Sequence, residues 1–232
     1  MAALSVRRRV EAAGPMLSTG SRRRYGLLLL ATLASLAVQG IVEPSGAQQV
    51  VVAALAGASL LLAFNAAQFG PRWLLPAAAL SGAGIALAVV QATTGEVGEG
   101  VARGMNAILL AVGPPAVAVG VVRSLRTGTV KVEAVMGVLS LYMLLGMMFG
   151  FGYGVIDQYG NQPFFADGEQ ATVSQCLYFS FTTLTTVGYG DLVAETNLGH
   201  TLAVFEALLG QIYLVTIVSL IVGNLGRSRR AS

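Results

Sequence analysis

The sequence is poor in charged residues: Asp, Glu, Lys and Arg make up only 11% of its 232 residues. A soluble domain carries about 25% of such residues, so this deficit excludes a soluble protein of ordinary composition. Hydrophobic residues account for 55% of the chain, and the mean hydropathy is +0.72. These values predict a protein that lies mostly in lipid.

Cysteine and catalytic motifs are also scarce. Cys176 is the one cysteine and cannot form a disulfide within the chain, so no oxidising compartment is indicated. The sequence holds no nucleophile elbow, His-Glu-x-x-His, phosphate loop or metal cluster. We therefore expect neither enzyme activity nor a cofactor. The net charge of +3 arises from arginine clusters beside apolar runs, which indicates segments flanking a membrane and no nucleic-acid partner.

Six apolar runs are long enough to cross a bilayer, which takes roughly 20 residues. A further apolar run, Val173–Leu184, is too short to span and is interpreted as a re-entrant helix. The predicted fold class is an all-α membrane protein with six transmembrane helices plus this re-entrant helix. The first run could instead be a cleaved signal peptide, although its apolar region exceeds the usual 7–15 residues or so. The expected spans are Tyr25–Val42, Ala47–Phe69, Trp73–Gln91, Gly104–Val122, Ala134–Ile156 and Leu198–Leu225.

The basic residues predict an orientation. With six spans and the N-terminus inside, Arg103 is the only one of the 14 Lys and Arg residues that falls outside. Cytoplasmic loops carry such an excess, so we expect both termini in the cytoplasm at a plasma membrane. The short loops fit a prokaryotic cell. The expected organisation is a basic tail (1–24), a four-helix membrane domain (25–123), a cytoplasmic linker (124–133), a two-span domain (134–226) and a short cytoplasmic tail (227–232).

The run Thr185-Thr186-Val187-Gly188-Tyr189-Gly190-Asp191 carries the chemistry. An ion that sheds its water needs rings of replacement oxygens, and closely spaced backbone carbonyls can supply them. Successive carbonyls line one axis only if the backbone alternates in handedness, and glycine reaches positive φ without steric penalty. Gly188 and Gly190 stand where that alternation needs them, and the Thr186 hydroxyl can add a ring below. This geometry gives the physical reason why such a run can act as a selectivity filter.

In this context, residues 134–226 resemble the potassium channel family: outer helix 134–156, pore helix 172–184, filter 185–191 and inner helix 198–225. Thr172-x-x-Gln175 fits a capping box at the start of the pore helix. The resemblance implies a potassium channel, with K⁺ as the permeant ion. It places the ion sites at the carbonyls of Thr186, Val187, Gly188 and Tyr189, and it includes Gly190 in the same K⁺-binding filter. Thr185, Asp191, Tyr178 and Phe179 are expected to support the filter, although the two aromatic residues could be ordinary packing residues.

A ring of carbonyls needs several filter segments, and this chain holds one. We therefore expect a homotetramer around a central pore, with cyclic symmetry, in contact with lipid. Acidic residues at the outer mouth would concentrate cations there. These residues are Asp157, Asp167, Glu169, Asp191 and Glu195.

The inner helix offers further candidates. Gly210 matches the glycine at which family members bend this helix, and close helix packing is the alternative reason for it. A stripe at helical spacing is formed by Gln211, Leu214, Val218 and Val222. The same resemblance implies that this stripe lines the cavity and gate below the filter.

Two titratable residues of the same helix leave alternatives open. Glu206 either hydrogen-bonds behind the filter or is protonated and tolerated near the outer interface. His200 is either an interfacial residue or a pH sensor.

The first four spans lack the arginines of a voltage sensor. The fourth run has none between Arg103 and Arg123, and holds Pro114-Pro115 instead. Moving one charge through 100 mV supplies about 2.3 kcal/mol, so weak or absent voltage sensing is expected. The predicted function is passive, potassium-selective conduction through a tetrameric pore. The alternative is a non-conducting or regulatory subunit of a hetero-oligomeric cation channel. The sequence indicates no gating stimulus.

Overall fold

The computed structural model describes residues 24–42, 45–95, 99–125 and 132–230. Within these ranges the regular secondary structure is helical, apart from one isolated antiparallel bridge. Six of the described helices are long and apolar enough to cross a membrane, judged by length and composition. A shorter helix, α6 (Val173–Leu184), is not among them. The prediction of an all-α membrane fold is confirmed.

Local sequence signals explain several helix ends. The side chain of Ser45 accepts a hydrogen bond from the Gln48 amide (3.2 Å) and caps the second span. Pro71 opens the third span, where its missing N–H costs nothing, and Gly95 ends that span with a φ of 70°. The helices are Arg24–Ile41, α2 (Gly46–Ala66), α3 (Pro71–Thr94), α4 (Glu99–Leu125), α5 (Val132–Tyr159), α6 (Val173–Leu184) and α7 (Asn197–Arg230).

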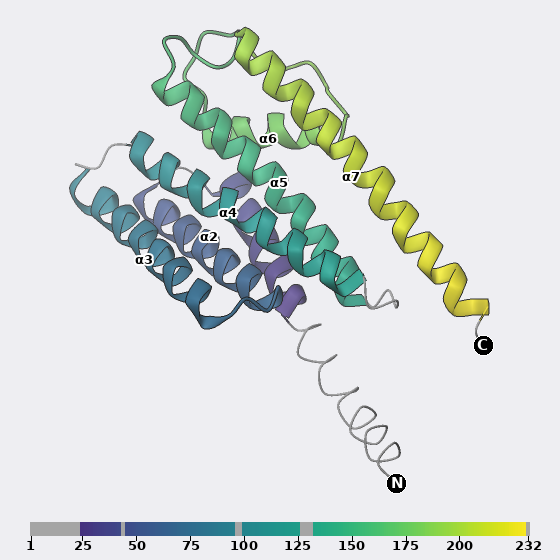
Figure 1. Cartoon of the computed structure of the whole chain (residues 1–232). Coiled ribbons are helices and arrows are strands. Elements are labelled where there is room, and N and C mark those ends of the chain that lie inside the picture. The colour runs from purple at the N-terminus through teal and green to yellow at the C-terminus, as the bar shows by residue number, and fades with distance from the viewer. Residues whose placement is uncertain (1–23, 43–44, 96–98, 126–131, 231–232) are drawn as a thin grey trace.

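The first four spans form a bundle that packs against α5. Helix α2 contacts α3 and α4, and α4 also packs along α5 (Figure 1). One apolar core runs through the bundle and reaches Leu177 of α6. Small residues let these helices approach closely: a Cβ added to Gly57 would lie 2.9 Å from the Ser81 side chain. The bundle therefore supports α5, and α5 in turn supports α6.

Helix α6 lies between α5 and α7 (Figure 1). Two glycines of α5 make room for it: a Cβ on Gly146 would lie 2.6 Å from the Phe181 ring, and one on Gly150 would lie 2.7 Å from the Leu177 side chain. These two glycines belong to one helical face, as their four-residue spacing predicts. The close approach fixes how deep α6 sits against the outer helix.

Helix α7 is longer than predicted. It continues to Arg230, whereas the sequence analysis ended the inner helix at residue 225 and assigned residues 227–232 to a cytoplasmic tail. The sequence has no proline there to end the helix. Most of the span Asn197–Ile217 is unburied, with exposed Phe205, Leu208 and Ile212.

A second, aromatic core lies under the connection between α5 and α7. Its buried members are Tyr153, Phe164, Phe165, Ala171, Cys176, Phe179 and Ala194. Asp157 is buried and accepts hydrogen bonds from the amides of Phe164 (2.9 Å) and Ala171 (3.0 Å). The bridge between Phe165 and Ala194 joins the segment before α6 to the segment after the filter. The loops on either side of the filter are thus held by a small core of their own.

Candidate ion-conduction site

Helix α6 begins at the capping box that the sequence predicts. The Thr172 side chain accepts a hydrogen bond from the Gln175 amide (3.2 Å). In return, the Gln175 side chain accepts one from the Thr172 amide (2.9 Å). Two backbone donors that a helix start leaves unpaired are thereby satisfied. The start of α6 is fixed by residues within one turn of each other.

The end of α6 positions residues 185–191, the predicted filter segment, which is called the filter below. The Thr186 amide donates to the Thr183 carbonyl (2.9 Å), and the amides of Val187 and Gly188 both donate to the Thr182 carbonyl (2.9 and 3.1 Å). The last carbonyls of a helix have no partner within the helix. The filter amides supply that partner, so their N–H groups point back toward α6.

The backbone of the filter alternates in handedness. Thr186, Gly188 and Gly190 have φ values of 58°, 52° and 79°, and no such value occurs at Val187 or Tyr189. Alternation of this kind turns successive carbonyls toward one side. Within the described part of the chain, no hydrogen bond is accepted by the carbonyls of residues 186–189. The segment therefore presents a row of unpaired oxygens.

Thr186 is the member of this alternation that sequence reasoning missed. A β-branched residue is rarely found at positive φ, so residue type gave no indication of it. Counting back two positions from Gly188 would have found it. Strained backbone of this kind persists where surrounding contacts hold it, and here the bond from the Thr186 amide to α6 does so.

The filter lies on the surface of the single chain. Val187 is 53% exposed and Tyr189 71% exposed. Nothing in the described part of the chain covers the face that carries these residues. An apolar and carbonyl-rich surface left open in this way indicates an incomplete site.

The outer end of the filter is held by an aromatic and acidic contact. The rings of Tyr178 and Tyr189 stack with centroids 6.3 Å apart, and the Tyr178 hydroxyl donates to Asp191 (2.8 Å). This hydrogen bond is the main reason that the pKa of Tyr178 is raised above its ordinary value. Tyr178 and Asp191 are thus brought together beside Tyr189, where the sequence analysis placed them.

Phe179 packs in the buried aromatic core and not beside Tyr189. It belongs to the buried aromatic core, with its ring 5.3 Å from Tyr153 and 5.4 Å from Phe165 in edge-on geometry. Consecutive residues of a helix point in directions about 100° apart, so Tyr178 and Phe179 cannot both face Tyr189. Phe179 therefore holds α6 against the aromatic core. Thr185 is the C-cap of α6, and its hydroxyl donates to the Phe181 carbonyl (2.6 Å).

Gly210 packs against the end of α6. A Cβ added there would overlap the Leu184 carbonyl oxygen and lie 3.0 Å from its carbon. The same carbonyl accepts a hydrogen bond from the Tyr142 hydroxyl of α5 (3.0 Å). The structure therefore gives the close-packing reason for this glycine, and helix α7 is continuous through it. Sequence reasoning did not single out Tyr142.

The expected cavity lining is only partly described. Gln211 and Leu214 are exposed on α7. The side chains of Val218 and Val222 lie outside the described residues. His200 is exposed at the start of α7.

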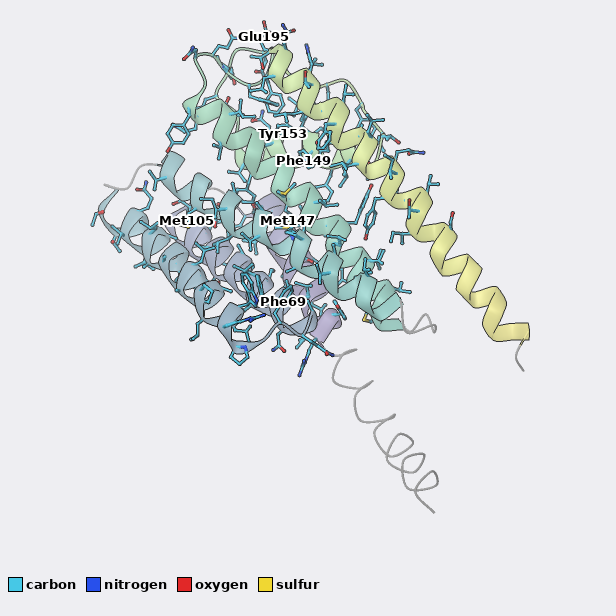
Figure 2. All side chains as sticks on the ribbon, in the orientation of Figure 1. Phe69, Met105, Met147, Phe149, Tyr153 and Glu195 are labelled. Carbon is cyan, nitrogen blue, oxygen red and sulfur yellow. The ribbon has the colours of Figure 1, made fainter. Side chains whose placement is uncertain are left out.

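Glu206 is fully buried and lies behind the filter. The Tyr153 hydroxyl donates to Glu206 Oε2 (2.6 Å), and the Ser180 hydroxyl lies 2.5 Å from Oε1. Figure 2 shows Tyr153 on α5 close to α7, with Glu195 in the loops beyond that end of the helices. The structure contains the hydrogen bonds of the first alternative, with partners on α5 and α6.

Comparison with known proteins identifies an ion channel domain in the C-terminal part of the chain. A family model described as an ion channel matches residues 141–226. Protein LctB of Geobacillus stearothermophilus is 33% identical over 116 residues, which cover 45% of this chain and 86% of that protein. The calcium-activated potassium channel slowpoke of Drosophila melanogaster is 38% identical over 56 residues, or 24% of this chain. Only 5% of slowpoke is covered by that match. No solved structure matches the chain significantly.

The apolar spans and the matched ion channel domain together define a multi-pass membrane ion channel, not an enzyme. The chain belongs to the potassium channel family.

Proposed function

We propose that this protein conducts potassium selectively and passively through a central pore formed by four copies of the chain. The single observation that carries the proposal is the alternating backbone of residues 186–190 with its unpaired carbonyls. Neutral carbonyl oxygens in stacked rings replace the hydration shell of K⁺ and release it again. The Thr186 hydroxyl would extend the row at its inner end.

The surface exposure of the filter supports assembly. One chain contributes one row of carbonyls, and the face that holds it is open (Val187 and Tyr189 are 53% and 71% exposed). The exposed apolar residues Phe205, Leu208 and Ile212 of α7 provide further surface for other subunits or lipid. A cyclic tetramer would bring four filter segments to one axis. The acidic outer loops would then surround its mouth and concentrate cations.

The direction of α6 supports cation selectivity. Its C-terminal end leads into the filter, and the negative end of a helix dipole favours a cation nearby. Four such helices would act on the same ion. The excess of Lys and Arg on one side of the spans supports cytoplasmic termini at a plasma membrane.

The proposal is tested in liposomes that contain the purified protein. We expect K⁺ flux well above Na⁺ flux and block by barium. Gly188→Ala should abolish the preference for K⁺, because alanine at positive φ costs about 1–2 kcal/mol and disturbs the alternation. Gly152→Ala is the matched control, because both glycines have open space around them but Gly152 has no positive φ.

Equal K⁺ and Na⁺ flux in the wild-type protein would contradict the proposal. No flux from the purified tetramer, restored by a second type of subunit, would favour a regulatory subunit instead.

A further inference from the structure

We propose that Glu206 is a neutral carboxylic acid whose proton completes a hydrogen-bond chain that holds α6 to α5 and α7 behind the filter. The chain joins three helices through the Gly146 carbonyl, the Ser180 hydroxyl, the Glu206 carboxyl group and the Tyr153 hydroxyl. Glu206 is then a positioning residue: it does not touch the ion but fixes the helix that carries the filter. This role rests on the proposed function only in that residues 185–191 are taken as the filter.

The argument begins with the number of protons. Ser180 Oγ lies 2.7 Å from the Gly146 carbonyl oxygen and 2.5 Å from Glu206 Oε1. The Tyr153 hydroxyl lies 2.6 Å from Glu206 Oε2. Each of these three oxygen–oxygen contacts needs a proton between its atoms. The serine and tyrosine hydroxyls supply one proton each, and the carbonyl and an ionised carboxylate supply none.

A protonated Glu206 provides the missing third proton. It donates to Ser180 Oγ, the Ser180 hydroxyl donates to the Gly146 carbonyl, and Tyr153 donates to the other carboxyl oxygen. Each of the four groups in this hydrogen-bond chain then has a partner, as buried polar groups normally do. With an ionised Glu206, one of the two contacts of Ser180 would bring two oxygens together without a proton.

The surroundings of Glu206 agree with a neutral group. The residue is fully buried, and within the described ranges no lysine, arginine or histidine forms an ion pair with it. The titratable groups near this site are those of Tyr153, Tyr142 and Cys176, none of them a cation at neutral pH. An unpaired buried charge is strongly unfavourable. The buried carboxyl group of Asp157 differs from that of Glu206, because two backbone amides donate to Asp157, whereas the partners of Glu206 are hydroxyl groups.

The position of the chain explains its effect on the filter. Ser180 lies on α6, one turn and a half before the filter begins, and Glu206 lies one turn before Gly210 on α7. Gly146 belongs to the pair of α5 glycines that let α6 approach closely. The chain therefore ties α6 to both neighbouring helices at the depth where the filter starts.

Infrared spectroscopy of the purified full-length protein tests the protonation state directly. The difference spectrum of wild type minus Glu206→Gln should contain the carbonyl stretch of a protonated carboxylic acid, shifted in D₂O. Carboxylate bands in its place would overturn the proposal. This measurement does not depend on which ion the channel passes.

The positioning role is tested through the thiol of Cys176, which is fully buried on α6. Glu206→Gln should react with a thiol reagent at the wild-type rate, because an amide donates to Ser180 and accepts from Tyr153 as the neutral acid does. Glu206→Ala should react about fivefold faster or more, because it leaves buried groups unpaired. Equally fast reaction of both variants would overturn the proposal.

Two buried serines provide a matched control. Ser180→Ala should accelerate labelling of Cys176 as Glu206→Ala does. Ser140→Ala should not, because the Ser140 hydroxyl bonds only within α5, to the Met136 carbonyl. In liposomes, Glu206→Gln should keep the wild-type ratio of K⁺ to Na⁺ flux and Glu206→Ala should lose it. If wild type itself passes both ions alike, the proposed function fails, while the infrared and labelling results still decide the role of Glu206.

Discussion

Replacing Gly210 by alanine tests whether this glycine is there for packing. Two effects oppose each other. Alanine is about 1 kcal/mol more favourable than glycine within a helix. The added Cβ, however, would overlap the Leu184 carbonyl oxygen at the end of α6.

The clash should outweigh the gain. Overpacking of a well-filled interior costs about 1–3 kcal/mol. The overlapped atom is backbone and is held by the Tyr142 hydroxyl, so it cannot rotate away as a flexible side chain would. The upper part of that range applies, which leaves a net destabilisation of about 1–2 kcal/mol. Since 1.4 kcal/mol is a factor of ten in an equilibrium constant, local opening of α6 should become about tenfold more frequent.

Cys176 again provides the assay, because the chain has one cysteine and its thiol is buried on α6. When opening and closing are fast, the labelling rate follows the population of the open form. Gly210→Ala should therefore label about tenfold faster than wild type. Gly152→Ala, a helical glycine with no atom near its missing Cβ, should label no faster.

Equal labelling of Gly210→Ala and Gly152→Ala would refute the packing argument. If Gly210→Ala changed channel opening while Cys176 was still labelled at the wild-type rate, Gly210 would act as a hinge. The two roles of this glycine are therefore distinguishable.

Two further predictions concern the ends of the filter assembly. Thr172→Ala removes the cap of α6 at a cost of about 1 kcal/mol, so Cys176 should label about fivefold faster. Thr201 is an exposed helical threonine, and Thr201→Ala should leave the labelling rate unchanged. Faster labelling in Thr201→Ala than in Thr172→Ala would contradict the capping role. Tyr178→Phe removes the hydrogen bond to Asp191. Because the pKa of Tyr178 is raised in the folded protein, its stabilisation is present below about pH 10 and is lost at higher pH. The thermal midpoint of wild type should approach that of Tyr178→Phe in alkaline solution, and a constant difference at all pH values would contradict this.

Much of the fold could be read from local patterns. Spans depend on runs of apolar residues, and the start of α6 depends on Thr172 and Gln175, which are three residues apart. The filter could be predicted from the resemblance of residues 185–191 to the potassium channel family, and the positive φ of Gly188 and Gly190 gives the physical reason for those two glycines. The length of α7 was less predictable, because its last turns carry neither a cap signal nor an apolar run.

The contacts that hold α6 against α5 and α7 depend on residues far apart in the chain. The sequence determined that residues 185–191 could present carbonyls, since handedness is a property of the backbone itself. Only the tertiary structure decided that Phe179 of α6 packs into the aromatic core and that Gly210 meets the Leu184 carbonyl. The same holds for Glu206, whose partners on α5 and α6 lie 53 and 26 residues away. Periodicity shows which residues share a face of one helix, but the approach of two helices decides which side chains meet.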